Sequence, residues 1–250
     1  MRLFALIGYP LTHSFSKKYF TEKFEKEAIG NSRYELLELP DYHDFPALVK
    51  SHPDLIGLNV TIPHKQNVIP FLDELDAASA ERIGAVNTIK VLPNGRLKGY
   101  NTDYYGFRIS LEQWLKGLEI IPQQLKALVL GNGGAAKAVL AALEDLQIEY
   151  KIVSRQSSAS AIGYDDLTPD IIATHRLIIN TSPVGTYPKT EECPAIPYAL
   201  LDKRHLLYDL VYNPTETLFL KKGKVQAAQT HNGLPMLHLQ AEKAWEIWNS

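Results

Sequence analysis

Short apolar runs alternate with segments of helical periodicity along most of the chain. Residues 3–7 (LFALI) form the first apolar run, which predicts a buried strand. Residues 16–28 carry apolar side chains at helical spacing, at Tyr19, Phe20, Phe24 and Ala28. Further strands are predicted at residues 34–39, 55–60, 85–91, 96–100, 127–130, 150–153, 177–180 and 206–210. Further helices are predicted at residues 45–51, 102–115, 135–146 and 237–248, and a helix interrupted near Pro70 is predicted at residues 66–75.

This alternation predicts an α/β fold with mostly parallel sheets. The chain has 250 residues, and at roughly 100–200 residues per domain that length accommodates one or two domains. Residues 127–153 read as strand, glycine turn, helix and strand, and the helix at 102–115 precedes them as a bridge. We therefore expect two domains, residues 1–102 and residues 103–234. The final helix, residues 235–250, is expected to pack back on the first domain.

Composition excludes several classes of function. Lys and Arg total 26 against 28 Asp and Glu, and the densest basic run, residues 221–224, is interpreted as a solvated turn. We expect no nucleic-acid partner. No run approaches ~18 uncharged apolar residues, so no membrane span is expected. Cys193 is the only cysteine, which fits a reducing compartment, and residues 1–8 do not resemble a signal peptide. The expected location is cytoplasmic.

Residues 131–136 (GNGGAA) fit the G-x-G-x-x-(G/A) pattern of dinucleotide-binding turns. In that pattern the glycines allow a tight turn and a close backbone approach to a pyrophosphate, which then faces the start of a helix. The turn follows a predicted strand and opens a predicted helix, as the pattern requires. The cofactor-binding residues predicted here are Gly131, Asn132, Gly133, Gly134 and Ala135. The alternative is a glycine-rich turn without a ligand.

The end of the next strand bears on which nicotinamide cofactor binds. An NAD site usually places a carboxylate there, whereas an NADP site places a cation. This chain has Ser154 and Arg155, and no carboxylate before Asp165. A guanidinium can bind a 2′-phosphate with paired donors, so we predict NADP(H). The alternative is that Arg155 is an ordinary surface residue.

Lys65 and Asp103 are the candidate catalytic pair. Hydride addition to a ketone builds negative charge on the carbonyl oxygen, and an ammonium group within reach stabilises that charge and donates a proton. A carboxylate beside the ammonium orients it. Taken singly, Lys65 could be a solvent-facing amine and Asp103 a helix-capping residue. Together with the nucleotide turn, they indicate a small dehydrogenase.

His13 and His64 adjoin the polar segments, which raises the possibility of a metal site. Neither histidine has the companion spacing of known zinc sites. We expect no metal and assign both histidines a supporting role.

Several collinear motifs resemble those of the shikimate dehydrogenase family. They lie at residues 8–16 (GYPLTHSFS), 59–65 (NVTIPHK), 84–88 (GAVNT), 99–103 (GYNTD), 180–185 (NTSPVG), 208–217 (YDLVYNPTET) and 232–237 (NGLPML), with Gln240 following. The resemblance implies reversible, NADP-dependent reduction of 3-dehydroshikimate to shikimate in aromatic amino-acid (chorismate) biosynthesis. It also implies that residues 1–102 bind the substrate and residues 103–234 form a Rossmann-like NADP domain, with the active site in the cleft between them.

The resemblance also assigns roles to individual residues. Lys65 and Asp103 correspond to the catalytic pair. The substrate ligands would be Ser14, Ser16, Thr61, Asn87, Tyr212 and Gln240. Leu210 and Gly233 would flank the nicotinamide, and the state of assembly would be a monomer or a homodimer.

Two positions depart from the family pattern. Lys17 stands where the family often has proline after its H-S-x-S motif, and residues 154–156 read SRQ where the family has N-R-T. Alternatives therefore stay open: a quinate/shikimate dehydrogenase with relaxed substrate or NAD use, or a ligand-binding relative without turnover. The presence of both Lys65 and Asp103 argues against the last.

Overall fold

The computed structural model describes residues 1–11 and 14–250, and within them the strands form two six-stranded sheets. The chain divides into two units. The first unit comprises Met1–Thr102 and Ala241–Ser250, and the second comprises Asp103–Gln240. Helix α7 (Leu234–Asn249) contains the boundary between Gln240 and Ala241.

The sheet of the first unit has the order β2-β1-β3-β5-β6-β4. Its strands are β1 (Arg2–Gly8), β2 (Ser32–Glu38), β3 (Leu55–Val60), β4 (Glu74–Leu75), β5 (Thr88–Val91) and β6 (Leu97–Tyr100). Strands β2, β1 and β3 run parallel, β5 is antiparallel to both β3 and β6, and β4 is parallel to β6. The turn between β5 and β6 is closed by the Leu92 N–H, which donates to the Arg96 carbonyl at 2.8 Å. The Pro-Asn-Gly sequence at 93–95 is typical of such a turn.

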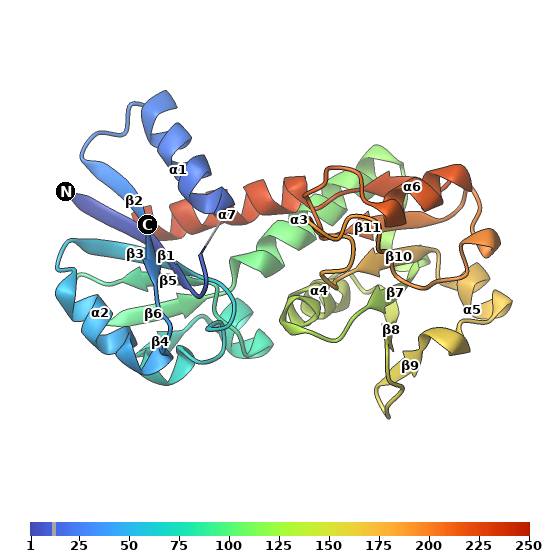
Figure 1. The fold of residues 1–250 in the computed structure, drawn as a ribbon, viewed down its shortest axis with the longest axis horizontal. Coiled ribbons are helices and arrows are strands. Elements are labelled where there is room, and N and C mark those ends of the chain that lie inside the picture. The colour runs from blue at the N-terminus through green and yellow to red at the C-terminus, as the bar shows by residue number, and fades with distance from the viewer. Residues whose placement is uncertain (12–13) are drawn as a thin grey trace. The chain divides into compact units, whose positions relative to one another are not determined.

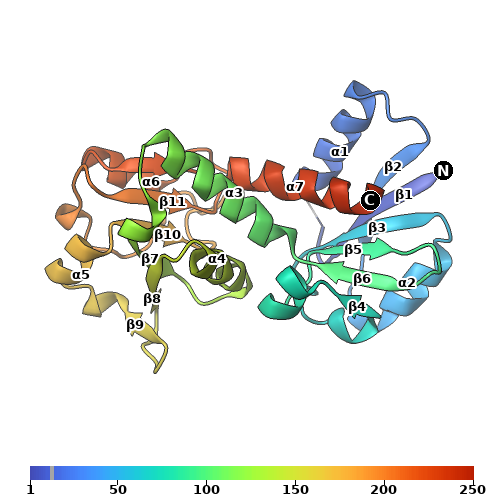
Figure 2. The same cartoon turned by 180° about the vertical axis from the view of Figure 1, so that it is seen from behind.

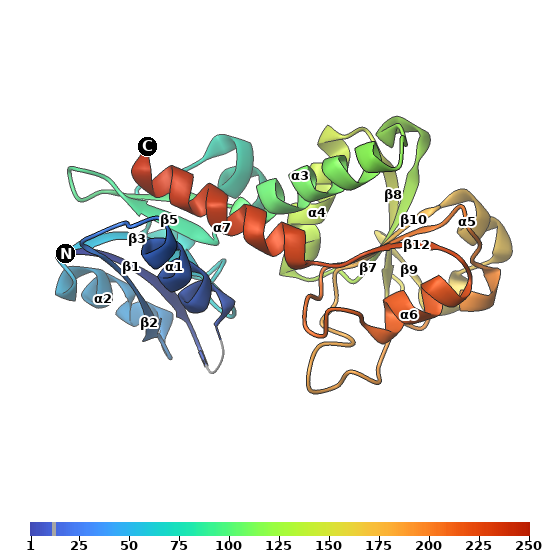
Figure 3. The same ribbon diagram turned by 90° about the horizontal axis from the view of Figure 1, so that it is seen from above.

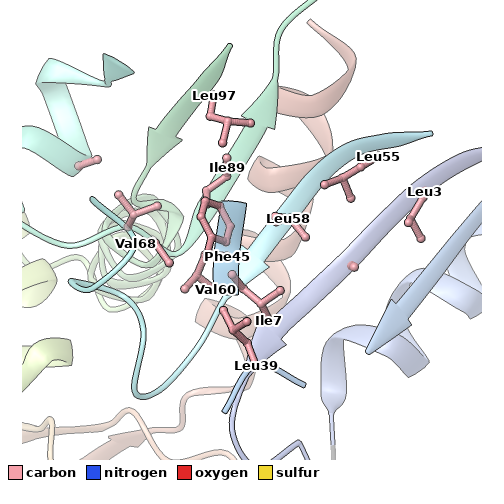
Figure 4. Packing of buried hydrophobic residues seen from close by; sticks show 13 residues of the cluster. Leu3, Ile7, Leu39, Phe45, Leu55, Leu58, Val60, Val68, Ile89 and Leu97 are labelled. Atoms are coloured by element: carbon pink, nitrogen blue, oxygen red, sulfur yellow. The ribbon is translucent and has the colours of Figure 1, made fainter. Parts of the chain in front are cut away.

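Alternate residues of β1 face the two sides of this sheet. Leu3, Ala5 and Ile7 join a core with Phe45 of α2 (Phe45–Ser51). Figure 4 shows Leu3, Ile7 and Phe45 in this core. Phe4 and Leu6 join a second core with residues of α1 (Phe15–Lys26) and the end of α7. Figures 1 and 2 show α1 and α2 on opposite sides of the sheet. The carboxyl ends of β1 and β3 are thereby held between two packed layers.

The sheet of the second unit is entirely parallel, with the order β12-β11-β10-β7-β8-β9. Its strands are β7 (Lys126–Leu130), β8 (Glu149–Ser154), β9 (Ala161–Gly163), β10 (Leu177–Asn180), β11 (Leu206–Asp209) and β12 (Gln229–His231). The chain starts at the central strand β7, proceeds outward through β8 and β9, and then returns to β10 on the other side. The strand order therefore reverses between β7 and β10, and ligands of doubly wound folds bind at that point.

Helices cover both faces of the second sheet (Figure 3). They are α3 (Thr102–Gly117), α4 (Gly134–Asp145), α5 (Pro169–Thr174) and α6 (Leu218–Val225). Ile172 of α5 and Phe219 of α6 share a core with Leu128 and Leu130 of β7. Every helix within residues 1–11 and 14–250 is too short or too polar to span a bilayer.

The predicted fold class, two α/β domains with mostly parallel sheets, is confirmed. The helix expected at residues 66–75 is wrong. This segment instead contains a short 3₁₀ turn (Ile69–Phe71) and strand β4. Pro70 cannot donate a hydrogen bond and disfavours a helix before it, so the segment is free to pair with β6. The interpretation of residues 221–224 as a turn is also wrong, because they lie inside α6, where Gly223 packs on Leu207.

Candidate active site

In the first unit, four of the predicted site residues follow the carboxyl ends of β1 and β3. The strands are parallel, with Ile7 beside Val60, and the Thr61 N–H donates to the Ile7 carbonyl at 2.9 Å. Thr61 and Lys65 follow β3, and both are half-buried. Ser14 and Ser16 follow β1, and the Ser14 hydroxyl caps α1 by accepting the Lys17 N–H at 3.3 Å. Thr12 and His13 of the opening motif lie outside the described residues.

Lys65 and Asn87 are brought together by backbone hydrogen bonds. The Lys65 carbonyl accepts the Val86 N–H at 2.7 Å, and the Asn87 carbonyl accepts the Val60 N–H at 2.8 Å. The Asn87 side chain is 4% exposed, and its Oδ1 accepts the backbone N–H of Thr102 at 2.6 Å. These hydrogen bonds hold the loop that carries Lys65, the candidate proton donor, next to the segment that carries Asn87, a candidate substrate ligand.

Asp103 is the first residue of the second unit. It lies in the first turn of α3, where a carboxylate interacts favourably with the helix dipole, and it is half-buried. One turn later, Gly106 packs so closely on α7 that a β-carbon would meet the Met236 carbonyl oxygen at 2.6 Å and the Gln240 β-carbon at 2.9 Å. Residues three apart share a helix face, so Asp103 and Gln240 belong to the contacting faces of α3 and α7. Gln240 is 8% exposed.

The predicted cofactor turn connects β7 to α4. Gly131 has φ +114°, a conformation that suits glycine, and its N–H donates to the Val153 carbonyl at 2.8 Å. Gly133 is the N-cap of α4, and no side chain caps this helix. A β-carbon added at Gly133 or Gly134 would meet no protein atom within 4 Å. An open, uncapped helix start fits the pyrophosphate of a dinucleotide, because its N–H groups can donate to the phosphates.

Ser154 and Arg155 lie beyond the end of β8, the strand beside β7. Leu130 of β7 pairs with Val153 of β8, so Arg155 follows the same sheet edge as the glycine turn. The Ser154 hydroxyl donates to the Gln156 carbonyl. Arg155 is exposed. Burial raises the pKa of Tyr164, and the positive charge of Arg155 works against that rise.

Leu210 and Gly233, the two residues expected to flank a nicotinamide, are in contact. A β-carbon on Gly233 would lie 2.0 Å from the Leu210 carbonyl oxygen. The Gly233 N–H donates to the Val211 carbonyl at 3.2 Å, and the Leu210 N–H donates to the Asn180 carbonyl at 3.0 Å. Tyr212 follows in the same loop and is 40% exposed. Glycine is required at 233 because two backbone segments meet there.

Sequence reasoning missed a buried carboxyl group behind this loop. Asp209 is fully buried at the end of β11, and its carboxylate accepts hydrogen bonds from the Asn180 amide (2.9 Å), the Val211 N–H (3.0 Å) and the Thr217 hydroxyl (2.6 Å). Burial raises the pKa of Asp209 to about 6, although these three hydrogen bonds oppose the rise. Asp209 and Asn180 lie within motifs already quoted, but nothing in the motifs shows that the two side chains meet.

Comparison with known proteins agrees with this geometry. A family model described as the shikimate dehydrogenase substrate binding domain matches residues 6–89. A shikimate dehydrogenase (NADP(+)) of Clostridium beijerinckii is 39% identical over 257 residues, which cover 99% of this chain and 92% of the relative. This chain belongs to the shikimate dehydrogenase family.

Solved structures of shikimate dehydrogenases share the fold over nearly the whole chain. One, in complex with NADP+, has a TM-score of 0.86 at 31% identity and covers 99% of this chain and 90% of that protein. Another, from Thermus thermophilus in complex with NADP(H) and shikimate, has a TM-score of 0.82 at 32% identity and covers 99% and 93%. The family resemblance inferred from the motifs is thereby confirmed, and the family's substrate-domain match lies within the first unit.

Proposed function

We propose that the chain catalyses the reversible, NADP-dependent reduction of 3-dehydroshikimate to shikimate. The observation that carries this proposal is the full-length match to NADP(+)-dependent shikimate dehydrogenases, at 39% identity in the relative from Clostridium beijerinckii. The structural likeness to a family member in complex with NADP(H) and shikimate supports it. In this proposal the first unit binds the substrate, the second unit binds the cofactor, and the reaction belongs to aromatic amino-acid biosynthesis.

Lys65 and Asp103 form the proposed catalytic pair. The glycine turn and Arg155 would hold NADPH, which would supply the hydride for the carbonyl carbon of the substrate. The Lys65 ammonium donates a proton to the carbonyl oxygen as negative charge develops there, and Asp103 orients that ammonium. General acid catalysis of this kind accelerates reactions by roughly 10²–10⁴-fold. The fixed backbone of Lys65, which accepts the Val86 N–H at 2.7 Å, supports this role because a catalytic group must be positioned before it reacts.

The proposed substrate ligands are hydroxyl and amide groups that suit a polyhydroxylated ring acid. Ser14 and Ser16 lie at the start of α1, where hydroxyls and helix N–H groups favour a carboxylate. Thr61 and Asn87 lie with Lys65 around the ends of β3 and β5. Gln240 and Tyr212 complete the proposed set. Each of these groups satisfies an oxygen of the substrate that would otherwise be buried without a partner.

The proposed cofactor ligands lie along one edge of the parallel sheet in the second unit. The glycine turn, with Gly131, Asn132, Gly133, Gly134 and Ala135, would hold the pyrophosphate at the uncapped start of α4. Arg155, with Ser154 beside it, would bind the 2′-phosphate of NADP. Leu210 and Gly233 would contact the nicotinamide. The exposed guanidinium of Arg155 supports the choice of NADP over NAD.

The experiment that tests the proposed function follows the nicotinamide absorbance band of the purified chain. Shikimate and quinate are each supplied with NADP+ and with NAD+. We expect reduction of NADP+ with shikimate to have the highest kcat/KM of the four combinations. Higher kcat/KM with quinate or with NAD+ would favour the relaxed-specificity alternative, and no turnover in any combination would favour a ligand-binding relative. The cytoplasmic location and the monomer-or-homodimer state remain predictions.

A further inference from the structure

A buried row of hydrogen bonds connects Tyr34 to Asn87 across the sheet of the first unit. The Tyr34 hydroxyl of β2 donates to the Asn59 Oδ1 of β3 at 2.7 Å. The Asn59 Nδ2 donates to the Thr88 hydroxyl of β5 at 3.2 Å, and that hydroxyl donates to the Asn87 Oδ1 at 3.3 Å. At the other end, burial raises the pKa of Tyr34, and the Ser16 hydroxyl opposes the rise. Asn87 is one of the proposed substrate ligands.

The row lies on the face of the sheet that α1 covers. Tyr34 pairs with Phe4, and Asn59 pairs with Leu6, and both of these β1 residues face the α1 side of the sheet. Tyr34 is 3% exposed and Thr88 is fully buried. Water therefore has little access to these groups. When a substitution removes one hydrogen-bond partner of the row, the remaining buried polar group is left without a partner.

The orientation of the Asn87 amide follows from its partners. A backbone N–H can only donate, so the atom that meets the Thr102 N–H at 2.6 Å must be Oδ1. The Thr102 hydroxyl, at 3.2 Å, and the Thr88 hydroxyl add further donors to the same oxygen. The remaining amide group of Asn87, Nδ2, is a donor and faces away from this cluster. Asn87 thus keeps Nδ2 as the donor that would meet a substrate oxygen in the proposed site.

The Tyr34 hydroxyl is not needed for apolar packing. The ring stacks on Phe20 of α1 at a centroid distance of 4.8 Å and an interplanar angle of 14°. A phenylalanine at position 34 would keep that stacking and would avoid placing a polar group in the core. The hydroxyl therefore has another role, which its hydrogen bond to Asn59 indicates.

We propose that Tyr34, Asn59 and Thr88 are positioning residues that fix the Asn87 amide for binding the ring acid. Asn87 serves a ring hydroxyl of the substrate, and the buried row keeps its amide in one orientation. This inference rests on the proposed function. The row adds substrate selectivity because a ring hydroxyl must match the fixed Asn87 amide.

Steady-state kinetics with shikimate and NADP+ test this inference through two variants. Tyr34→Phe removes only the hydroxyl, and Thr88→Val removes the central hydroxyl with little change of shape. We expect each variant to raise KM for shikimate roughly two- to tenfold, the range for one lost hydrogen bond, while KM for NADP+ stays the same. The matched control is Tyr198→Phe, which removes a hydroxyl that donates to the Pro194 carbonyl at 2.8 Å in the second unit. KM for shikimate should be unchanged in the control.

The double variant distinguishes a connected row from two independent losses. If Tyr34 and Thr88 act through Asn59, the rise in KM for the double variant should be smaller than the product of the two single rises. Unchanged KM for shikimate in both single variants, or equal changes for shikimate and NADP+, would overturn the inference while the wild-type chain still turns over. Absence of turnover by the wild-type chain would overturn the proposed function instead. If Tyr34→Phe does not fold, Thr88→Val alone decides between these outcomes.

Discussion

The carbonyl oxygen of Leu210 occupies the space where a side chain at Gly233 would begin. A β-carbon there would lie 2.0 Å from that oxygen, whereas ordinary contact begins at 3.4 Å. The clash involves backbone on both sides, so no side-chain rotation can relieve it. The loop after β11 and the turn after β12 must keep this approach for Leu210 to stay in place.

Gly233→Ala should therefore impair cofactor binding and stability together. The two backbone segments have to separate by more than about 1 Å, which costs about 1–3 kcal/mol, as overpacking typically does. We expect KM for NADP+ to rise more than KM for shikimate, together with a lower melting temperature. Gly117→Ala at the end of α3 is the matched control, because a β-carbon there meets no protein atom within 4 Å. Wild-type kinetics in Gly233→Ala would contradict the proposed role of this contact.

Lys65→Ala should remove the proposed proton donor while preserving the loop. The Lys65 carbonyl, which holds the Val86 N–H at 2.7 Å, is present in any variant of the side chain. We expect kcat with shikimate to fall by about 10²–10⁴-fold with a much smaller change in KM. The control is Lys50→Ala, which removes an exposed lysine of α2. A change in KM alone would make Lys65 a binding residue rather than an acid.

Local sequence patterns predicted much of the fold. Residues 55–60 and 177–180 form strands at the expected bounds, because a short apolar run is nearly sufficient to identify a buried parallel strand. Pro-Asn-Gly at 93–95 marked the β5–β6 turn, and the glycines at 131–134 marked the start of α4. Helix α6 was missed because Lys221, Lys222 and Lys224 obscure its short apolar face.

Contacts between distant segments could not be predicted in this way. The Tyr34–Asn59 hydrogen bond depends on β1 lying between β2 and β3, and the Asp209–Thr217 hydrogen bond depends on how the loop after β11 folds back. From the sequence alone, Tyr34 in an alternating strand is interpreted as a core residue, and Asp209 after an apolar run is interpreted as the end of a strand. The partners of these polar groups are set by strand order, which local periodicity does not encode.

Arg155→Ala should reduce the preference for NADP+ over NAD+. The guanidinium is exposed beyond β8 and offers paired donors to a 2′-phosphate, an interaction that NAD+ does not make. Loss of hydrogen bonds to a charged group costs about 1.5–3 kcal/mol, so kcat/KM for NADP+ should fall by roughly 10- to 100-fold. The value for NAD+ should stay within about twofold.

Lys151→Ala provides the control for this comparison. Lys151 is an exposed cation on the same strand β8, so its removal changes the net charge by the same amount. We expect the ratio of the two kcat/KM values to be unaffected. Equal losses with both cofactors in Arg155→Ala, or a wild-type preference for NAD+, would refute the assignment of Arg155 to the 2′-phosphate.

Asp209 should make the stability of the chain depend on pH. Burial raises its pKa from 3.8 to about 6, so between these values the folded chain holds a proton that the unfolded chain has released. The stabilisation is fully present below pH 3.8 and is lost as the pH rises through about 6. A shift of this size corresponds to about 3 kcal/mol. Asp209→Asn cannot ionise, so its stability relative to wild type should increase by up to that amount from pH 4 to pH 8.

Urea unfolding of both proteins at one-unit pH intervals measures this difference. Asp209→Asn keeps an oxygen for the Asn180 amide and the Val211 N–H, so the variant retains two of the three hydrogen bonds. Thr217→Val gives a second, independent check. The Thr217 hydroxyl donates to the carboxylate at 2.6 Å and lowers the pKa of Asp209, so its removal should shift the loss of stability to higher pH. Parallel stability curves for wild type and Asp209→Asn across the whole range would show that Asp209 stays ionised, and the raised pKa would then be wrong.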